Sequence, residues 1–127
     1  MRSKNQFTDE IVARIQKEKI IGVRAGADSA HKIIGIWAVV VEGRVFVRSY
    51  SMKPRSWWRT FKEDPRGVIK VNSRQIKVRP VFTRSERLKK LVDRAYAEKF
   101  PTPGSRVFVE GFKKKERRDT TTELVPL

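Results

Sequence analysis

Two adjacent tryptophans, Trp57 and Trp58, lie among basic residues in the stretch from Pro54 to Pro65. Flat aromatic rings interleaved with basic side chains suit the stacking of unpaired bases and the attraction of anions. On a helix Trp57 and Phe61 are four residues apart and share a face, whereas Trp58 lies about a quarter-turn away. This spacing predicts that Trp57 enters the protein core and that Trp58 reaches a neighbouring surface.

The tryptophan pair is expected on a short helix over residues 56–63. Ser56 can cap this helix, because its hydroxyl accepts a hydrogen bond from a free backbone N–H group. Pro65 ends the helix, since the residue before a proline avoids the α region. Strands expected before and after it would hold the helix in place.

The hydrophobic pattern predicts one domain over residues 1–127. Its expected parts are an N-terminal segment 1–19 with a helix from Thr8, barrel strands over 20–82, a helix within 83–100, and a C-terminal segment 104–127 with a final strand. Thr83 and Glu86 have the spacing of a capping box at the start of the second long helix. Residues 106–112 fit either a strand or a short helix.

Six short strands are expected. Their ranges are 20–25, 33–41, 44–50, 68–71, 75–82 and 120–125. Glu42-Gly43 is a typical tight turn between two of them. Short links of this kind favour antiparallel pairing, and closure into a small barrel would remove exposed strand edges.

The composition limits the class of protein. A chain of 127 residues with 39% hydrophobic residues can bury a core, and no apolar run approaches the roughly 20 residues that a membrane span needs. The absence of cysteine excludes disulfides and thiolate metal sites, and the single histidine, His31, argues against a histidine zinc site. We therefore expect a cytoplasmic protein with no metal and no contact with a membrane.

Charge favours anionic partners. Thirty lysines and arginines against fourteen acidic residues leave a net charge of +16. Such a field attracts nucleic acids, phosphorylated cofactors and acidic surfaces. The basic residues are spread along the whole chain, which is also typical of a solvated surface.

The order of these motifs resembles the flavin-binding split-barrel superfamily, which includes proteins like pyridoxamine-phosphate oxidase. The sequence is similar in particular to the deazaflavin-dependent nitroreductases and to the uncharacterised domain-of-unknown-function family 2255. The likeness covers residues 20–100 and extends more loosely over the last strand. It rests on the Trp37 strand, the Glu42-Gly43 turn and the pattern Pro54, Trp57, Trp58, Phe61, Asp64-Pro65.

The resemblance implies a mainly β fold with peripheral helices: a six-stranded antiparallel split β-barrel that forms a homodimer. It also implies FMN or a deazaflavin near the subunit interface, with redox chemistry supplied by the cofactor. Arginine and lysine donors suit its phosphate, and a tryptophan face suits its ring. No residue stands out as catalytic. The implied cofactor-binding residues are Lys32, Arg48, Ser49, Lys53, Arg55, Trp57 and Trp58.

One loop departs from the pattern of the resembled group. The phosphate-binding loop corresponds to the residues from Gly26 to Lys32, where a second glycine is missing. Asp28 places a negative charge where phosphate would bind, and Lys32 is the basic residue that remains. His31 has no nucleophilic partner nearby in the sequence, so we expect a surface position for it.

Three classes of function stay open. The first is a flavin- or deazaflavin-dependent oxidoreductase, which would bind a phosphorylated small molecule. The second is a cofactor-free binding module whose pocket is filled by side chains such as Trp58 or Tyr50. The third is a nucleic-acid-binding protein that uses the positive charge. For any of them we expect a homodimer through the barrel face that carries Trp37, Arg48 and Tyr50.

Overall fold

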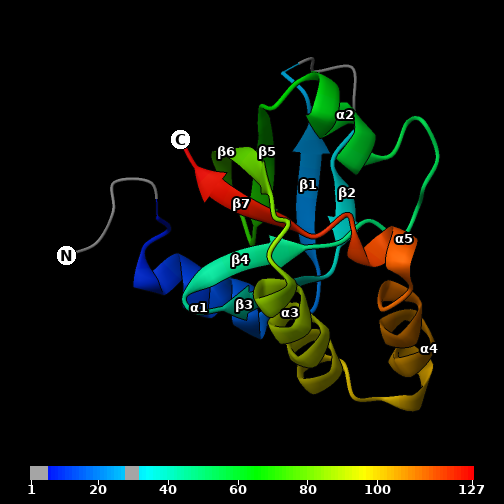
Figure 1. The fold of residues 1–127 in the computed structure, drawn as a ribbon. Coiled ribbons are helices and arrows are strands. Elements are labelled where there is room, and N and C mark those ends of the chain that lie inside the picture. Colours follow the sequence, from blue (N-terminus) through cyan, green and yellow to red (C-terminus); the bar gives the residue numbers. More distant parts are fainter. Residues whose placement is uncertain (1–5, 28–31) are drawn as a thin grey trace.

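The computed structural model describes residues 6–27 and 32–127, which form five helices and seven strands (Figure 1). In chain order the elements are α1 (Asp9–Lys17), β1 (Ile21–Ala25), β2 (Ile34–Ile36), β3 (Ala38–Val41), β4 (Arg44–Val47), α2 (Trp57–Glu63), β5 (Gly67–Val71), β6 (Arg74–Phe82), α3 (Glu86–Lys99), α4 (Pro103–Phe112), α5 (Lys115–Arg118) and β7 (Thr122–Pro126).

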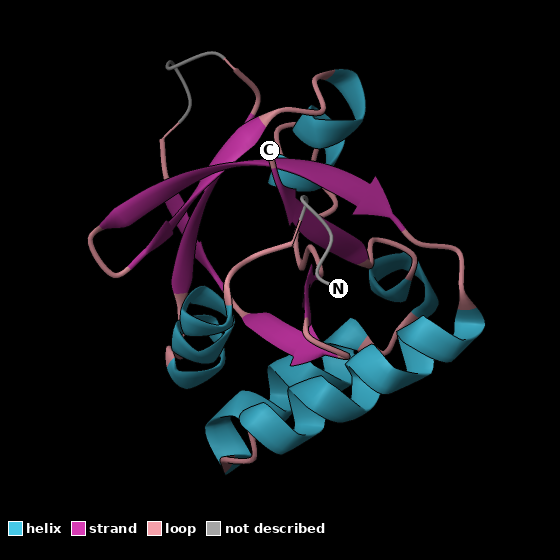
Figure 2. Cartoon of the chain, turned by 90° about the vertical axis from the view of Figure 1, so that its left-hand side faces the viewer, coloured by secondary structure: helices cyan, strands magenta, loops and turns pink. Residues whose placement is uncertain are grey.

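The strands form one antiparallel sheet in the order β2-β1-β5-β6-β7-β4-β3. The two strands at the ends of this order, β2 and β3, are consecutive in the chain and separated only by Trp37. Because one continuous stretch of the chain forms both end strands, the sheet curls until β2 and β3 nearly meet. The result is a nearly closed, barrel-like sheet with helices outside it (Figure 2).

The prediction of a mainly β fold with peripheral helices is confirmed, but six strands was one too few. The strand expected over 33–41 is divided at Trp37, because its first half pairs with β1 and its second half with β4. A strand that exchanges one partner for another has to bend at the crossing point. The other five expected strands are present with slightly different ends.

Tight turns set the register of two hairpins. Glu42 and Gly43 have φ angles of 56° and 73°, the backbone expected for a two-residue turn between β3 and β4. Asn72, with φ at 59°, begins the corresponding turn between β5 and β6. The turn predicted at Glu42-Gly43 is therefore confirmed.

Side-chain caps begin the helices α1 to α4, and one predicted cap was wrong. Thr8 and Ser56 cap α1 and α2 as expected. The cap of α3 is Ser85, whose Oγ accepts from the Leu88 N–H at 3.2 Å, so the capping box expected at Thr83 does not form. Thr83 instead accepts from the backbone of Ser85, which positions the cap. Among the helices that the structure describes, none is long and apolar enough to cross a membrane.

The side chains of β4 divide the core into two clusters. Val45 and Val47 are buried inside the barrel with side chains of α1 and α2. Phe46 is buried in a second cluster, between the outer face of the sheet and the helices α3 and α4. This alternation follows from the pleat of a strand. It also directs Arg48 toward α3.

Candidate ligand-binding site

An open cavity of about 600 Å³ lies between β2, the loop from β4 to α2, and the helix α4. Its volume is in the range of small-molecule binding sites. Aliphatic residues of β2 line part of it. The aromatic side chains that line it are Trp37, Tyr50, Trp57, Phe108 and Phe112.

Ring contacts fix the aromatic wall of the cavity. Trp37 stacks on Phe100 with centroids 4.2 Å apart and planes 10° from parallel. Tyr50 meets Phe108 and Phe112 edge-on, at 5.4 and 5.6 Å. Edge-to-face and stacked pairs of this kind add about 0.5–1.5 kcal/mol each beyond their burial. The wall is therefore ordered before any ligand enters.

Tyr50 is held from the side of α4 and α5. Arg117 lies over its ring, with the guanidinium carbon 3.8 Å from the centroid, and donates to the Tyr50 carbonyl at 2.8 Å. The ring also packs against Gly111, where an added Cβ would lie 2.8 Å from Tyr50 Cε2. A residue larger than glycine at position 111 would thus push the ring away from the helix.

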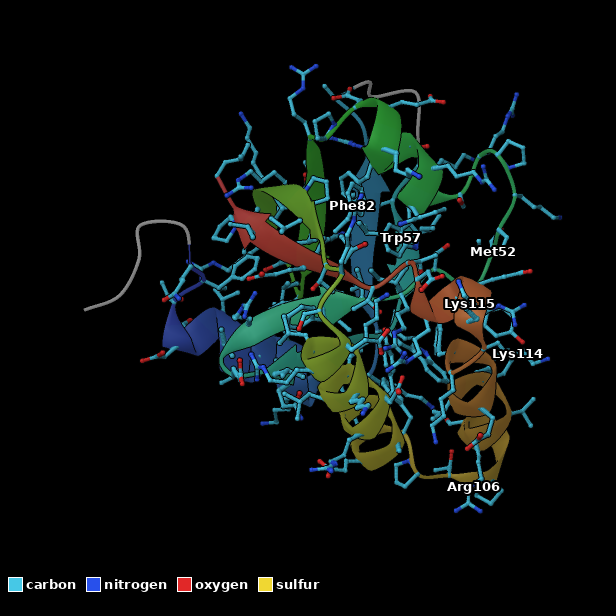
Figure 3. All side chains as sticks on the ribbon, in the orientation of Figure 1. Met52, Trp57, Phe82, Arg106, Lys114 and Lys115 are labelled. Atoms are coloured by element: carbon cyan, nitrogen blue, oxygen red, sulfur yellow. The ribbon has the colours of Figure 1, made fainter. Side chains whose placement is uncertain are left out.

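The helix α2 places its two tryptophans differently. Trp57 is 7% exposed, and its ring meets the buried Phe61 ring at 6.0 Å, which confirms the predicted shared face. Trp57 also borders the cavity and lies at the foot of α2 in Figure 3. Trp58 does not line the cavity; the Lys62 amine lies 4.6 Å from the centroid of its ring. Trp58, one of the implied cofactor-binding residues, therefore lies outside this cavity.

Basic side chains stand at the edge of the cavity. Lys53 and Arg55 line it and are exposed, and neither pairs with an acidic group among the described residues. A smaller pocket of about 150 Å³ adjoins it, sharing Arg55 and Trp57 with the larger one. Lys32, also exposed, lines this smaller pocket together with Thr60. Two predicted cations thus line the aromatic cavity, and a third lines the pocket beside it.

Arg48, by contrast, is used within the protein. Its guanidinium is fully buried, forms an ion pair with Asp93, and donates to Thr121 Oγ1 at 2.7 Å. It donates further to the carbonyl oxygens of Lys89 and Phe112, at 2.9 and 3.2 Å. Burial lowers the pKa of Arg48, which the pairing with Asp93 partly offsets. Arg48 borders the cavity, but its guanidinium is not free to bind a phosphate there.

Hydrogen bonds between backbone groups and the Tyr96 hydroxyl join the barrel to α3. Its N–H donates to Tyr96 Oη at 3.1 Å, and Tyr96 Oη donates to the Trp37 carbonyl at 2.7 Å. Burial raises the pKa of Tyr96, so this hydroxyl stays protonated and keeps both bonds. Ser49 is similarly occupied, since its Oγ donates to the Ser51 carbonyl at 2.6 Å.

The sequence did not point to the α4 side of the cavity. Residues 106–112 fitted a strand or a helix, so Phe108 and Phe112 were not assigned to a site. The structure forms α4 here because Thr102 caps the helix and Pro103 occupies its first position. That threonine–proline signal would have identified the helix from the sequence. Asp28 and His31 of the expected phosphate loop lie outside the described residues.

The fold and the cavity define a small, nearly closed β-barrel with an aromatic pocket. Residues 11–124 match the model of a family described as "Uncharacterized protein conserved in bacteria (DUF2255)". The protein belongs to this family, as the motifs around Trp57 predicted. The wider likeness to flavin-binding split barrels stays a prediction.

Comparison with solved structures supports the fold. The crystal structure of the conserved hypothetical protein Rv2991 from Mycobacterium tuberculosis superposes with a TM-score of 0.62 at 12% sequence identity, covering 100% of this chain and 84% of the other. At that identity the likeness shows a shared fold. Comparison with curated proteins gives no match.

Proposed function

We propose that this protein binds a flavin-type cofactor, FMN or a deazaflavin, in the aromatic cavity. One observation carries this proposal: a cavity of about 600 Å³ walled by aromatic rings is also lined by two basic side chains that pair with no acidic group in the part of the chain that the structure describes. A planar aromatic ligand with an anionic tail matches both parts.

The cations at the edge would bind the phosphate of the ligand. Arg55 lines both the aromatic cavity and the small pocket that contains Lys32, so it stands where ring and tail would join. Arginine can bind two phosphate oxygens at once, and Lys53 adds a further charge. Trp57 would then pack against the ring system. Arg48 and Ser49 keep the loop in place and do not contact the phosphate.

The reaction class proposed is electron or hydride transfer by an oxidoreductase. The bound cofactor would supply that chemistry. The chain itself would orient the ring between the aromatic walls and limit the access of water to it. No side chain of the cavity is placed as a general acid or base.

We further propose that a second copy of the chain covers the open side of the cavity. Ile34, Tyr50 and Phe108 line the cavity and are 47%, 39% and 46% exposed. Grouped apolar side chains of this size are commonly covered by a partner. Trp37 and Tyr50 fit the dimer face expected from the sequence, whereas the buried Arg48 does not.

The dimer can be tested by light scattering at micromolar concentration. We expect the mass of two chains, about twice 14.8 kDa, and a shift toward monomer in a Phe108→Asp variant, because a charge on that apolar face opposes pairing. A monomer mass for the unchanged protein would refute the proposal.

The alternative functions find less support in the geometry. A cofactor-free module would fill its pocket, but Trp58 lies outside the cavity and Tyr50 forms one wall of it. A nucleic-acid site at the tryptophan pair needs a free ring face, and Lys62 and Arg59 both lie over the Trp58 ring, at 4.6 and 5.9 Å.

The phosphate subsite is tested by comparing FMN with riboflavin, which lacks the phosphate. We expect flavin fluorescence titrations to show tighter binding of FMN. Arg55→Ala should weaken FMN binding by about tenfold and leave riboflavin unchanged, because a charged hydrogen bond of about 1.5 kcal/mol is lost. Lys77→Ala, which removes the same charge from an exposed position on β6, is the matched control. Equal loss in both variants would show a general effect of charge and contradict the subsite.

A further inference from the structure

The amine of Lys99 occupies a second site, away from the aromatic cavity. It lies at the C-terminal end of α3, where Nζ donates to the Ile15 carbonyl of α1 at 2.9 Å and to the Ala38 carbonyl of β3 at 2.6 Å. These two bonds fix the amine. An ammonium group has three N–H bonds, so one tetrahedral position remains for either a proton or a lone pair.

The surroundings of this amine favour its neutral form, which carries a lone pair, more than water does. Burial lowers the pKa of Lys99 to about 8, an effect that the nearby Glu18 carboxylate partly offsets. The other titratable groups that share its pocket are Lys17 of α1 and Lys19 just beyond it. The pocket residues from the start of α4 carry no titratable group. Lys99 therefore holds a neutral fraction at neutral pH that an exposed lysine lacks.

A pocket of about 240 Å³ is lined by Lys99 and by Phe100, and the Lys99 amine lies 5.4 Å from the centroid of the Phe100 ring. Lys17 and Lys19 line it with their positive charges, and the hydroxyls of Thr102 and Ser105 line it as well. Phe100 and Pro101 supply an apolar part. The pocket thus combines a fixed amine, a place for an anion and room for a small apolar group.

We propose that Lys99 is an acylation site for small acyl phosphates. Lys17 and Lys19 would attract the phosphate and bring the acyl carbon to the amine. The neutral nitrogen attacks that carbon and forms a C–N bond. The bond from the carbon to the bridging oxygen breaks, and its electron pair leaves with inorganic phosphate. The nitrogen then releases one proton to water, so a neutral amide replaces the amine.

The test is the rate of acetylation by acetyl phosphate, followed lysine by lysine with mass spectrometry of peptides. At pH 7 we expect Lys99 to react at least about tenfold faster than Lys77, since its larger neutral fraction outweighs its lower intrinsic nucleophilicity. The rate at Lys99 should level off above pH 8, because burial lowers the pKa of this amine to about 8. A rate at Lys99 no faster than the rate at Lys77, or a rate at Lys99 that keeps rising to pH 10, would overturn the proposal.

A double variant, Lys17→Ala with Lys19→Ala, tests the role of the anion. Both side chains are exposed, so the fold should tolerate their loss. We expect Lys99 to lose most of its reactivity toward acetyl phosphate and to keep its reactivity toward a neutral acetyl ester. Inorganic phosphate should slow the reaction of the unchanged protein with acetyl phosphate. It should slow neither the reaction of the double variant nor the reaction with the neutral ester. Undiminished reaction of the double variant with acetyl phosphate would contradict an acyl-phosphate site.

Discussion

Replacement of Trp57 by alanine is expected to lower the free energy of unfolding by about 3–5 kcal/mol. The ring is 7% exposed, packs edge-on against Phe61, and joins α2 to the interior of the barrel. The same ring borders the cavity, so FMN binding should weaken as well. Urea denaturation measures the first effect and flavin titration of the folded variant measures the second.

Trp58→Ala is the matched control on the same helix. Trp58 is only partly buried and lies outside the cavity. We expect a smaller loss of stability and unchanged ligand affinity. If Trp58→Ala weakened FMN binding while Trp57→Ala did not, the ligand would have to lie on the other side of α2.

Replacement of Arg48 by methionine is expected to cost about 3–5 kcal/mol of stability, because it breaks a buried ion pair by removing one partner. Methionine fills a similar length but donates no hydrogen bond. Thr121 Oγ1 and two carbonyl oxygens would lose this donor at the junction of β4, α3 and α4, and Asp93 would keep only its bond from Arg118. Urea denaturation monitored by tryptophan fluorescence gives the change in free energy.

Arg87→Met is the surface control for this experiment. Its pairing with Glu42 is largely exposed to solvent, and exposed pairs contribute about 0–1 kcal/mol. The expected difference between the two variants is therefore several kcal/mol. A stable Arg48→Met protein that binds FMN more weakly would instead indicate that this guanidinium acts on the ligand.

The strand pattern and the tryptophan helix could be predicted because their signals are local. The Glu42-Gly43 pair marked the turn between β3 and β4, and the four-residue spacing placed Trp57 with Phe61. The division of one strand at Trp37 could not be predicted, since it depends on which partners pair with the two halves. That choice is made by the closure of the whole sheet.

Part of the lining of the candidate cavity was also predicted, because residue type is a local signal. Residue type identified Lys53 and Arg55 as candidate donors, and both line the cavity. Residue type equally suggested Arg48, but tertiary contacts with α3 and α4 occupy its guanidinium. Phe108 joined the wall only through the packing of α4, which lies far along the chain. Local patterns show which side chains suit a ligand, and packing decides which of them remain free to bind it.

The central claim is tested most directly by the visible absorption spectrum of the purified protein titrated with FMN and, separately, with a deazaflavin. The account predicts that at least one of them shows shifted absorption bands, because the ring moves from water into an aromatic cavity, with saturation near one ligand per chain. In Trp57→Ala the change should require a higher ligand concentration, and in Trp58→Ala it should be unaltered. Spectra identical to those of both free cofactors at millimolar concentration would contradict a flavin-type site.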